Sequence, residues 1–257
     1  MRISLQPAYV LHSRPYRDSS ALLEVLTAEY GRVSLVARGA RRRKRGGTAN
    51  ALLQPFTPLL LSFSGRSELK TITATEAAGR AVTLRGDKLF SALYVNELLV
   101  RLLHRHDAHP QLFAQYGTTL AALSESEAVD DVLRHFEFFL LDDLGYGFDL
   151  TVDGRSGEPV AAGDWYQYHP ELGLVARAGV SDPSLPVFAG SEVLQIARGE
   201  FGGAARPAAK RLLRQVLATH LGDAPLKSRD LFRSRRPAVD LDEGAQQAER
   251  LRRVDQP

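Results

Sequence analysis

The chain has 257 residues, 44% of them hydrophobic and 25% charged, and these ordinary globular proportions suit one large domain or two modest ones. It contains no cysteine, which excludes disulfides, thiolate zinc sites and thiol nucleophiles, and no apolar run long enough to cross a membrane. The net charge of +3 is unevenly distributed along the chain. Residues 1–80 have 13 Lys and Arg against 5 Asp and Glu, residues 81–200 have 8 against 18, and residues 201–236 have 9 against 2. The basic segments at the two ends indicate a polyanionic partner.

Short β-strands are predicted for the first part of the chain. Val33, Leu35 and Ala37 alternate with other residues in a way typical of a strand, and turns that contain Pro or Gly separate the segments. The predicted strands are 8–13, 21–27, 32–37, 59–63 and 71–75. Five short strands in fewer than 90 residues favour a small closed barrel of the OB type, with an SH3-like barrel as the alternative.

From about residue 88 the hydrophobic period changes to that of helices. One helix carries Val95, Leu98, Leu99, Leu102 and Leu103 on a single face. Others are predicted over 111–123, over 129–144 with Gly145 as its C-terminal stop, and from Pro207 to just before Gly222.

These patterns predict an α+β protein with an N-terminal OB-fold barrel followed by a mostly helical domain. The boundaries are 1–80 for the barrel and 81–236 for the helical domain, which includes a loop-rich insertion near 146–190. That insertion contains one strand-like piece, 165–168, and a turn at 170–173. Residues 237–257 have little apolar content and are expected to be a flexible tail.

The densest positive charge lies on a glycine-bracketed loop, residues 38–47, directly after a predicted strand. Like charges packed this closely repel one another unless an anion screens them, so we predict a nucleic-acid-binding loop rather than a merely solvated one. Arg32 and Arg38 would point to the same side of a strand that leads into the loop, and other cations lie near turns. The predicted DNA-binding residues of this domain are therefore Arg14, Arg32, Arg38, Arg41, Arg42, Arg43, Lys44, Arg45, Arg66 and Lys70.

A second basic cluster lies on the last long predicted helix and in the segment after it, and adds Lys210, Arg211, Arg214, Lys227 and Arg229 to the predicted DNA-binding residues. A solvated helix face explains this cluster equally well. Aromatic platforms for bases are weakly indicated, because core packing explains Tyr9, Tyr16, Tyr30, Phe56 and Phe63 better. Backbone electrostatics should therefore dominate, with low sequence specificity.

Catalytic motifs are missing from the sequence. It has no GxxxxGK[ST], no GxGxxG after a strand, no GxSxG and no HExxH. His106 and His109 have the spacing of helical metal ligands, but no Glu or third ligand completes a set, so we interpret the segment from His104 to His109 as a helix end rather than a metal site. We expect a binding protein without a cofactor rather than an enzyme.

Several segments form a distinctive set: 9–16 (YVLHSRPY), 31–33 (GRV), 37–41 (ARGAR), 53–59 (LQPFTPL), 93–99 (LYVNELL), 133–137 (LRHFE), 144–147 (LGYG), 221–222 (LG) and 225–232 (PLKSRDLF). Together they resemble the RecO family of bacterial recombination mediators. No single piece is decisive, but their order and spacing are specific.

The resemblance implies an OB domain, a helical domain and work in DNA break and gap repair by the RecF pathway. It implies binding and annealing of single- and double-stranded DNA, binding of the acidic C-terminal tail of the single-stranded-DNA-binding protein, and help to RecA loading together with RecR. It assigns Arg134 to the site for that tail, and a guanidinium can clamp a carboxylate there. An ordinary surface arginine is the competing interpretation. A cytoplasmic, nucleoid-associated location follows from the same resemblance.

This chain departs from some relatives at one place. They carry a cysteine zinc site in the loop-rich region, whereas residues 151–159 here contain no cysteine, so no zinc is expected and packing around Trp165, Tyr166 and Tyr168 should order the region. Two alternatives to the repair mediator stay open: a stand-alone OB-type RNA-binding factor, and a metal-dependent nuclease that uses the acidic middle.

Overall fold

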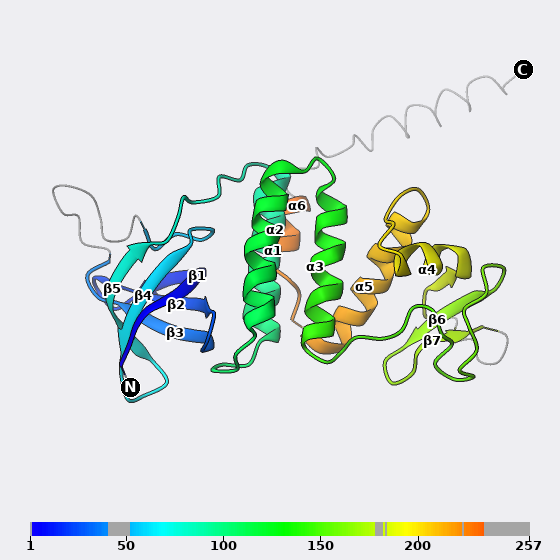
Figure 1. Ribbon diagram of the computed structural model, residues 1–257, viewed down its shortest axis with the longest axis horizontal. Coiled ribbons are helices and arrows are strands. Elements are labelled where there is room, and N and C mark those ends of the chain that lie inside the picture. The colour runs from blue at the N-terminus through cyan, green and yellow to red at the C-terminus, as the bar shows by residue number, and fades with distance from the viewer. Residues whose placement is uncertain (1, 41–51, 178–181, 183, 223, 234–257) are drawn as a thin grey trace, which may run out of the picture.

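A computed structural model describes residues 2–40, 52–177, 182, 184–222 and 224–233. The barrel lies at one end, a layer of long helices lies in the middle, and a small sheet lies at the other end (Figure 1). None of the helices in the described ranges is long and apolar enough to cross a membrane.

The N-terminal strands close into a five-stranded barrel with the order β1-β2-β3-β5-β4. The strands are β1 (Arg2–Tyr16), β2 (Ser20–Thr27), β3 (Gly31–Ala37), β4 (Leu59–Ser64) and β5 (Lys70–Ala77). Alternation is clearest in β4, where Leu59, Leu61 and Phe63 are buried in the barrel core. The neighbours in the barrel are antiparallel except β3 and β5, which are parallel. The predicted OB-type barrel followed by a helical domain is confirmed.

Polar side chains fasten the barrel to the helices. The Asn96 side chain of α1 (Asp87–Leu102) donates to the Leu11 carbonyl at 2.9 Å and accepts from the Tyr116 hydroxyl at 2.7 Å. Tyr9 packs its ring edge-on against Tyr116, with centroids 5.0 Å apart. Because the Asn96 amide and the Tyr116 hydroxyl are buried and hydrogen-bonded, they fix the orientation of barrel and helices.

Arg32 belongs to the same junction. Its side chain is 14% exposed, pairs with Glu24 at 2.9 Å and donates through Nε to the carbonyl of Leu103, just after α1, at 3.1 Å. The backbone N–H of His106 donates in turn to the Arg32 carbonyl. The left-handed Gly31 approaches Asp107 so closely that a Cβ would overlap that residue's backbone, so this turn requires glycine.

The central helices follow the predicted periodicities. They are α1, α2 (Pro110–Glu125), α3 (Val129–Asp143) and α5 (Ala205–Leu221), and their apolar faces form one core. Gly145 has φ +76°, which ends α3 as predicted. α5 begins two residues before Pro207, so the predicted start was slightly late.

The loop-rich region contains more regular structure than the sequence predicts. A small sheet with the order β7-β6-β8 is formed by β6 (Trp165–His169), β7 (Gly173–Ala176) and β8 (Val187–Ala189), and α4 (Gly190–Ala197) follows it. Tyr166 and Tyr168 are buried as expected, but Trp165 is 54% exposed, so its expected packing role is wrong.

Asp153 organises the turn where some relatives were expected to bind zinc. Its carboxylate accepts the backbone N–H groups of Arg155, Ser156 and Ala176 at 2.8–3.1 Å, which links the 153–157 turn to the end of β7. Burial opposes the charged form, but these backbone donors dominate and lower the pKa of Asp153. A buried carboxylate thus orders this cysteine-free segment.

Replacing Asp153 with Asn should lower the free energy of unfolding by about 1–3 kcal/mol near neutral pH, because it weakens charge-assisted hydrogen bonds in a buried turn. The pKa of Asp153 is depressed in the folded state. The difference in the free energy of unfolding between the parent chain and the variant should therefore be complete above the ordinary Asp pKa of about 3.9, and it should shrink as the pH falls through the folded-state pKa. Urea unfolding at several pH values measures it. Glu158→Gln, which changes an exposed carboxylate in the same segment, is the control. An Asp153→Asn loss that does not vary with pH would contradict the assignment.

Candidate functional site

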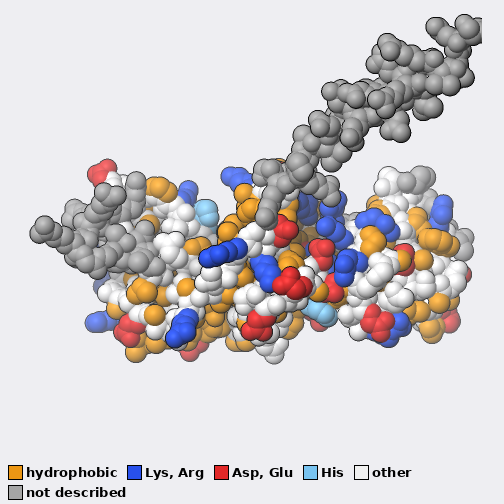
Figure 2. Space-filling model, turned by 90° about the horizontal axis from the view of Figure 1, so that it is seen from above, with side chains coloured by type: hydrophobic (Ala, Val, Ile, Leu, Met, Phe, Trp, Pro, Cys, Tyr) orange, Lys and Arg blue, Asp and Glu red, His pale blue; other side chains and the backbone are white. Residues whose placement is uncertain are grey.

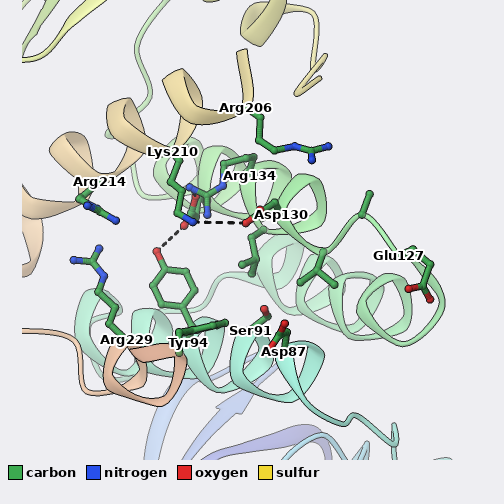
Figure 3. Close-up of a pocket in the computed structure, with 15 residues that line it drawn as sticks. Asp87, Ser91, Tyr94, Glu127, Asp130, Arg134, Arg206, Lys210, Arg214 and Arg229 are labelled. Atoms are coloured by element: carbon green, nitrogen blue, oxygen red, sulfur yellow. Dashed lines mark hydrogen bonds and ion pairs between the residues drawn. The ribbon is translucent and has the colours of Figure 1, made fainter. Parts of the chain in front are cut away.

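A pocket of about 840 Å³ opens between the helices, and residues from α1, α3, α5 and α6 (Ser228–Arg233) line it (Figure 3). The first of its lining residues in the sequence is Asp87 and the last is Phe232. Its basic members are Arg134, Arg206, Lys210, Arg214 and Arg229. Figure 2 shows Lys and Arg side chains gathered over these helices, with Asp and Glu among them.

Arg134 lies deep in this pocket, with a side chain only 7% exposed. Its Nη1 is 2.9 Å from Oε2 of Glu137, one helical turn further along α3, and the Tyr94 hydroxyl donates to Oε1 of Glu137 at 2.5 Å. Burial raises the pKa of Glu137 despite the opposing charge of Arg134, and burial together with Glu137 raises the pKa of Tyr94. The competing interpretation of Arg134 as an ordinary helix-surface arginine is therefore wrong, because Arg134 is buried.

The Nε of Arg134 is buried and has no hydrogen-bond partner among the described residues. An unpaired guanidinium donor away from water is costly, and an anion bound nearby would offset part of this cost through its charge. The Glu137 carboxylate neutralises only part of the charge, because four further cations surround the cavity. The cations of this pocket offer positive charge to a carboxylate or a phosphate.

The rim cations come mostly from one face of α5. Arg206, Lys210 and Arg214 are spaced four residues apart on α5, and all three line the pocket (Figure 3). Arg206 lies 3.4 Å from Asp131 and Lys210 lies 4.0 Å from Asp130, both in half-exposed pairs worth little free energy. Within the described part of the chain, neither Arg214 nor Arg229 forms an ion pair.

The pocket also has an acidic end and an apolar component. Asp87 and Glu127 lie on the side away from Arg214 and Arg229 (Figure 3). Apolar lining comes from Val129, Leu133 and Phe232, and the ring of Phe232 packs edge-on against Phe90 with centroids 5.7 Å apart. An elongated ligand with both negative charge and an apolar group matches this surface better than a bare phosphate chain does.

Glu97 holds α6 against α1 and so positions Arg229 and Phe232. Its carboxylate accepts the backbone N–H groups of Lys227 and Ser228 at 2.8 Å each, and the Ser228 hydroxyl at 2.6 Å. Burial opposes ionisation of Glu97, but the hydrogen bonds from Ser228 and Lys227 prevail and lower its pKa. This carboxylate satisfies the otherwise free donors at the start of a six-residue helix.

Replacing Glu97 with Ala should weaken binding of an acidic peptide several-fold and lower the free energy of unfolding by about 1–3 kcal/mol, because α6 loses three hydrogen bonds to a carboxylate. Fluorescence anisotropy and urea unfolding measure the two effects. Ser228→Ala removes only one side-chain hydrogen bond and should show a smaller loss of both. Equal effects of the two variants would show that Glu97 does not hold α6 in this way.

The second predicted basic cluster divides into separate locations. Lys210, Arg214 and Arg229 line the pocket with Arg134, whereas Arg211 lies over the ring of Phe188, 5.7 Å from its centroid, and Lys227 is exposed outside the pocket lining. Sequence reasoning missed Arg206. The four-residue spacing from Arg206 to Lys210 to Arg214 would have revealed it, because such residues share one helix face.

The first predicted cluster is only partly described. Arg41, Arg42, Arg43, Lys44 and Arg45 lie outside the described residues. Arg14 and Arg38 are exposed, and both lie at the end of the barrel where β2 begins, because Tyr16 pairs with Ser20 and Ala37 with Ala21. These two arginines therefore flank the start of the 41–51 segment.

Three other predicted residues of the barrel lie elsewhere. Lys70 is buried and pairs with Leu35, where β3 and β5 run parallel. Because the turn with Arg66 precedes β5 and Arg38 follows β3, these two arginines lie toward opposite ends of the paired strands. Arg32 is occupied at the junction with α1. We therefore do not include Arg32, Arg66 or Lys70 in the surface around the loop.

The aromatic residues of the barrel pack mainly inside the protein. Phe56 and Phe63 are buried, Tyr30 packs on Phe63, and Tyr9 packs on α2. Tyr16, which has Arg17 5.3 Å from its ring centroid, is half-exposed beside Arg14. These positions favour contacts with the backbone of a nucleic acid over base stacking.

The histidine-rich segment forms no metal cluster among the described residues. It connects α1 to α2, and His109 precedes α2 with its Nδ1 2.6 Å from Oδ2 of Asp143 at the end of α3. His109 therefore stands at the start of a helix, whereas the helix-end interpretation placed it at a C-terminus.

Comparisons with known proteins agree with this architecture. Residues 1–80 match the family model for the recombination protein O N terminal, and residues 84–230 match that for the recombination protein O C terminal. A relative from Nitrosococcus oceani is 48% identical over 233 residues, which cover 90% of this chain and 94% of the relative. Relatives from Stutzerimonas stutzeri and Pseudomonas aeruginosa PAO1 are also 48% identical, over 88% and 90% of this chain and 92% and 95% of their own.

An OB-type barrel joined to a helical domain, with both domains matched, defines a protein of DNA recombination and repair. The three relatives are each named DNA repair protein RecO. The chain belongs to the RecO family, and this membership supports a role in DNA repair.

Proposed function

We propose that this chain is a non-enzymatic repair mediator that binds an acidic protein tail in the helical pocket and DNA on the barrel. The observation that carries the proposal is Arg134, whose Nε is buried without a hydrogen-bond partner among the described residues, in a cavity with four more cations. An acidic tail with an apolar end would place carboxylates among these cations and its apolar group beside Leu133. The resemblance makes the tail of the single-stranded-DNA-binding protein the expected ligand.

Strand annealing follows from the second surface. Cations at Arg14, Arg38 and the 41–45 segment would neutralise phosphates of two strands at once, which lowers their mutual repulsion and needs no fuel. Family membership favours DNA over RNA as the polyanion. Cooperation with RecR, help in loading RecA and a cytoplasmic, nucleoid-associated location rest on the family resemblance.

The test is annealing of complementary strands that are pre-coated with the single-stranded-DNA-binding protein. We expect this chain to speed annealing of coated strands, and a coat protein that lacks its acidic tail should abolish the effect while annealing of naked strands persists. Magnesium-dependent cutting of the DNA would overturn the non-enzymatic assignment. Equal affinity for RNA and DNA of one sequence would favour an RNA-binding factor.

A further inference from the structure

The pocket lies next to the point where the chain leaves its last described helix. Phe232 and Arg229 of α6 line the pocket, and the described residues end at Arg233. The described chain therefore ends beside the pocket wall. Eight residues, from Phe232 to Asp240, can span at most about 27 Å at roughly 3.4 Å per residue, which is ample to turn back into the cavity.

The sequence beyond that point contains an acidic and apolar stretch, Val239-Asp240-Leu241-Asp242-Glu243. It lies outside the described residues and beyond residue 230, where the family match ends. Three carboxylates within four residues, interleaved with Leu241, present the chemistry that the pocket fits: negative charge for the rim cations and an apolar side chain for Leu133 and Val129.

We propose that residues 239–243 occupy the pocket of the same chain and compete with the acidic tail of the partner. This inference rests on the proposed function, because both ligands would use Arg134 and the α5 cations. A tethered segment meets its site at an effective concentration in the millimolar range. Even a weakly bound pentapeptide therefore lowers the apparent affinity of the pocket for an external ligand. The effect would restrict the pocket to partners that present many acidic tails or bind tightly.

The test uses the full chain and a fluorescein-labelled acidic peptide that ends in phenylalanine. Asp242→Asn with Glu243→Gln should tighten peptide binding about three- to tenfold, as expected when a tethered competitor of millimolar effective concentration is weakened. Glu249→Gln with Asp255→Asn makes the same change of net charge further along the chain and should leave the affinity unchanged. Equal tightening in both double variants would overturn the proposal, because it would show a general charge effect.

A direct measurement keeps this inference separate from the proposed function. A labelled peptide of residues 237–257 should bind the full chain that carries Asp242→Asn and Glu243→Gln, and Arg214→Ala added to that chain should weaken it, whereas Arg211→Ala should not. Absence of peptide binding would overturn the proposal even if the partner's tail binds. If residues 237–257 bind and the Phe-ended peptide does not, the pocket has an internal ligand and the proposed function fails. Inhibition that grows with protein concentration would indicate exchange between copies and would overturn the intramolecular assignment.

Discussion

Replacing Arg134 with Ala is expected to weaken binding of an acidic, Phe-ended peptide by about 30-fold or more. Truncating one partner of a buried, hydrogen-bonded charge pair typically costs about 2–5 kcal/mol, and 2 kcal/mol corresponds to a factor of about 30. The loss should be this large because Arg134 is the deepest cation and its Nε has no competing partner among the described residues. Charge reversal, Arg134→Glu, should abolish binding. Fluorescence anisotropy measures the affinity.

The same change leaves Glu137 as a buried carboxylate without its cation, so a folding defect must be distinguished from a binding defect. Arg134→Ala combined with Glu137→Gln removes that charge and should restore stability in urea without restoring peptide affinity. On α5, Arg214→Ala should weaken binding, whereas Arg211→Ala, whose guanidinium lies over Phe188, should not. If Arg134→Glu binds the peptide as the parent chain does, the pocket is not the site.

Replacing Arg41, Arg42, Arg43, Lys44 and Arg45 with alanine together should weaken binding of every DNA sequence alike. The reason is that binding to phosphates depends on charge and release of counterions, and not on base identity. The slope of the logarithm of the binding constant against the logarithm of salt concentration should become shallower by roughly 0.7 for each phosphate of a single strand that the variant no longer neutralises. Titrations of labelled oligonucleotides at several salt concentrations measure it.

The control keeps the same number of substitutions but uses cations away from the loop. Alanine at Arg66, Arg155, Arg177, Arg198 and Arg211 removes five cations outside the loop, four in other connecting segments and Arg211 on α5, and the salt slope should then stay nearly unchanged. Peptide affinity should survive the loop variant, because the pocket is built by the helical domain alone. An unchanged salt slope in the loop variant would show that residues 41–45 do not bind DNA.

Regular hydrophobic periods explain why most of the fold could be predicted from the sequence. α1 and α3 bury residues three and four positions apart, and β4 buries every second residue, so burial and pattern coincide. β8 has three residues and α6 has six, which is too few for a period to show, and both form because of long-range contacts. The Glu97 contact that anchors α6 spans 131 positions in sequence.

The site was predicted less well for the same reason. A basic residue looks alike in sequence whether it faces solvent or a buried carboxylate. The Arg32 side chain donates to the carbonyl of Leu103, 71 positions away, and Lys70 is buried at the start of β5, so neither outcome follows from local charge. Family resemblance identified Arg134, but its four neighbouring cations come from α5 and α6, which only the folded chain brings to α3.

The composition of the pocket wall has a consequence for synthesis of the protein. Its lining begins at Asp87 on α1 and is completed by Arg229 and Phe232 on α6, which Glu97 draws back onto α1. The barrel uses only residues up to Ala77, so it can close while the later residues are still being added by the ribosome. A nascent chain would therefore complete the barrel long before the pocket, and the proposed recognition of an acidic tail would have to wait until residue 232 has left the ribosome.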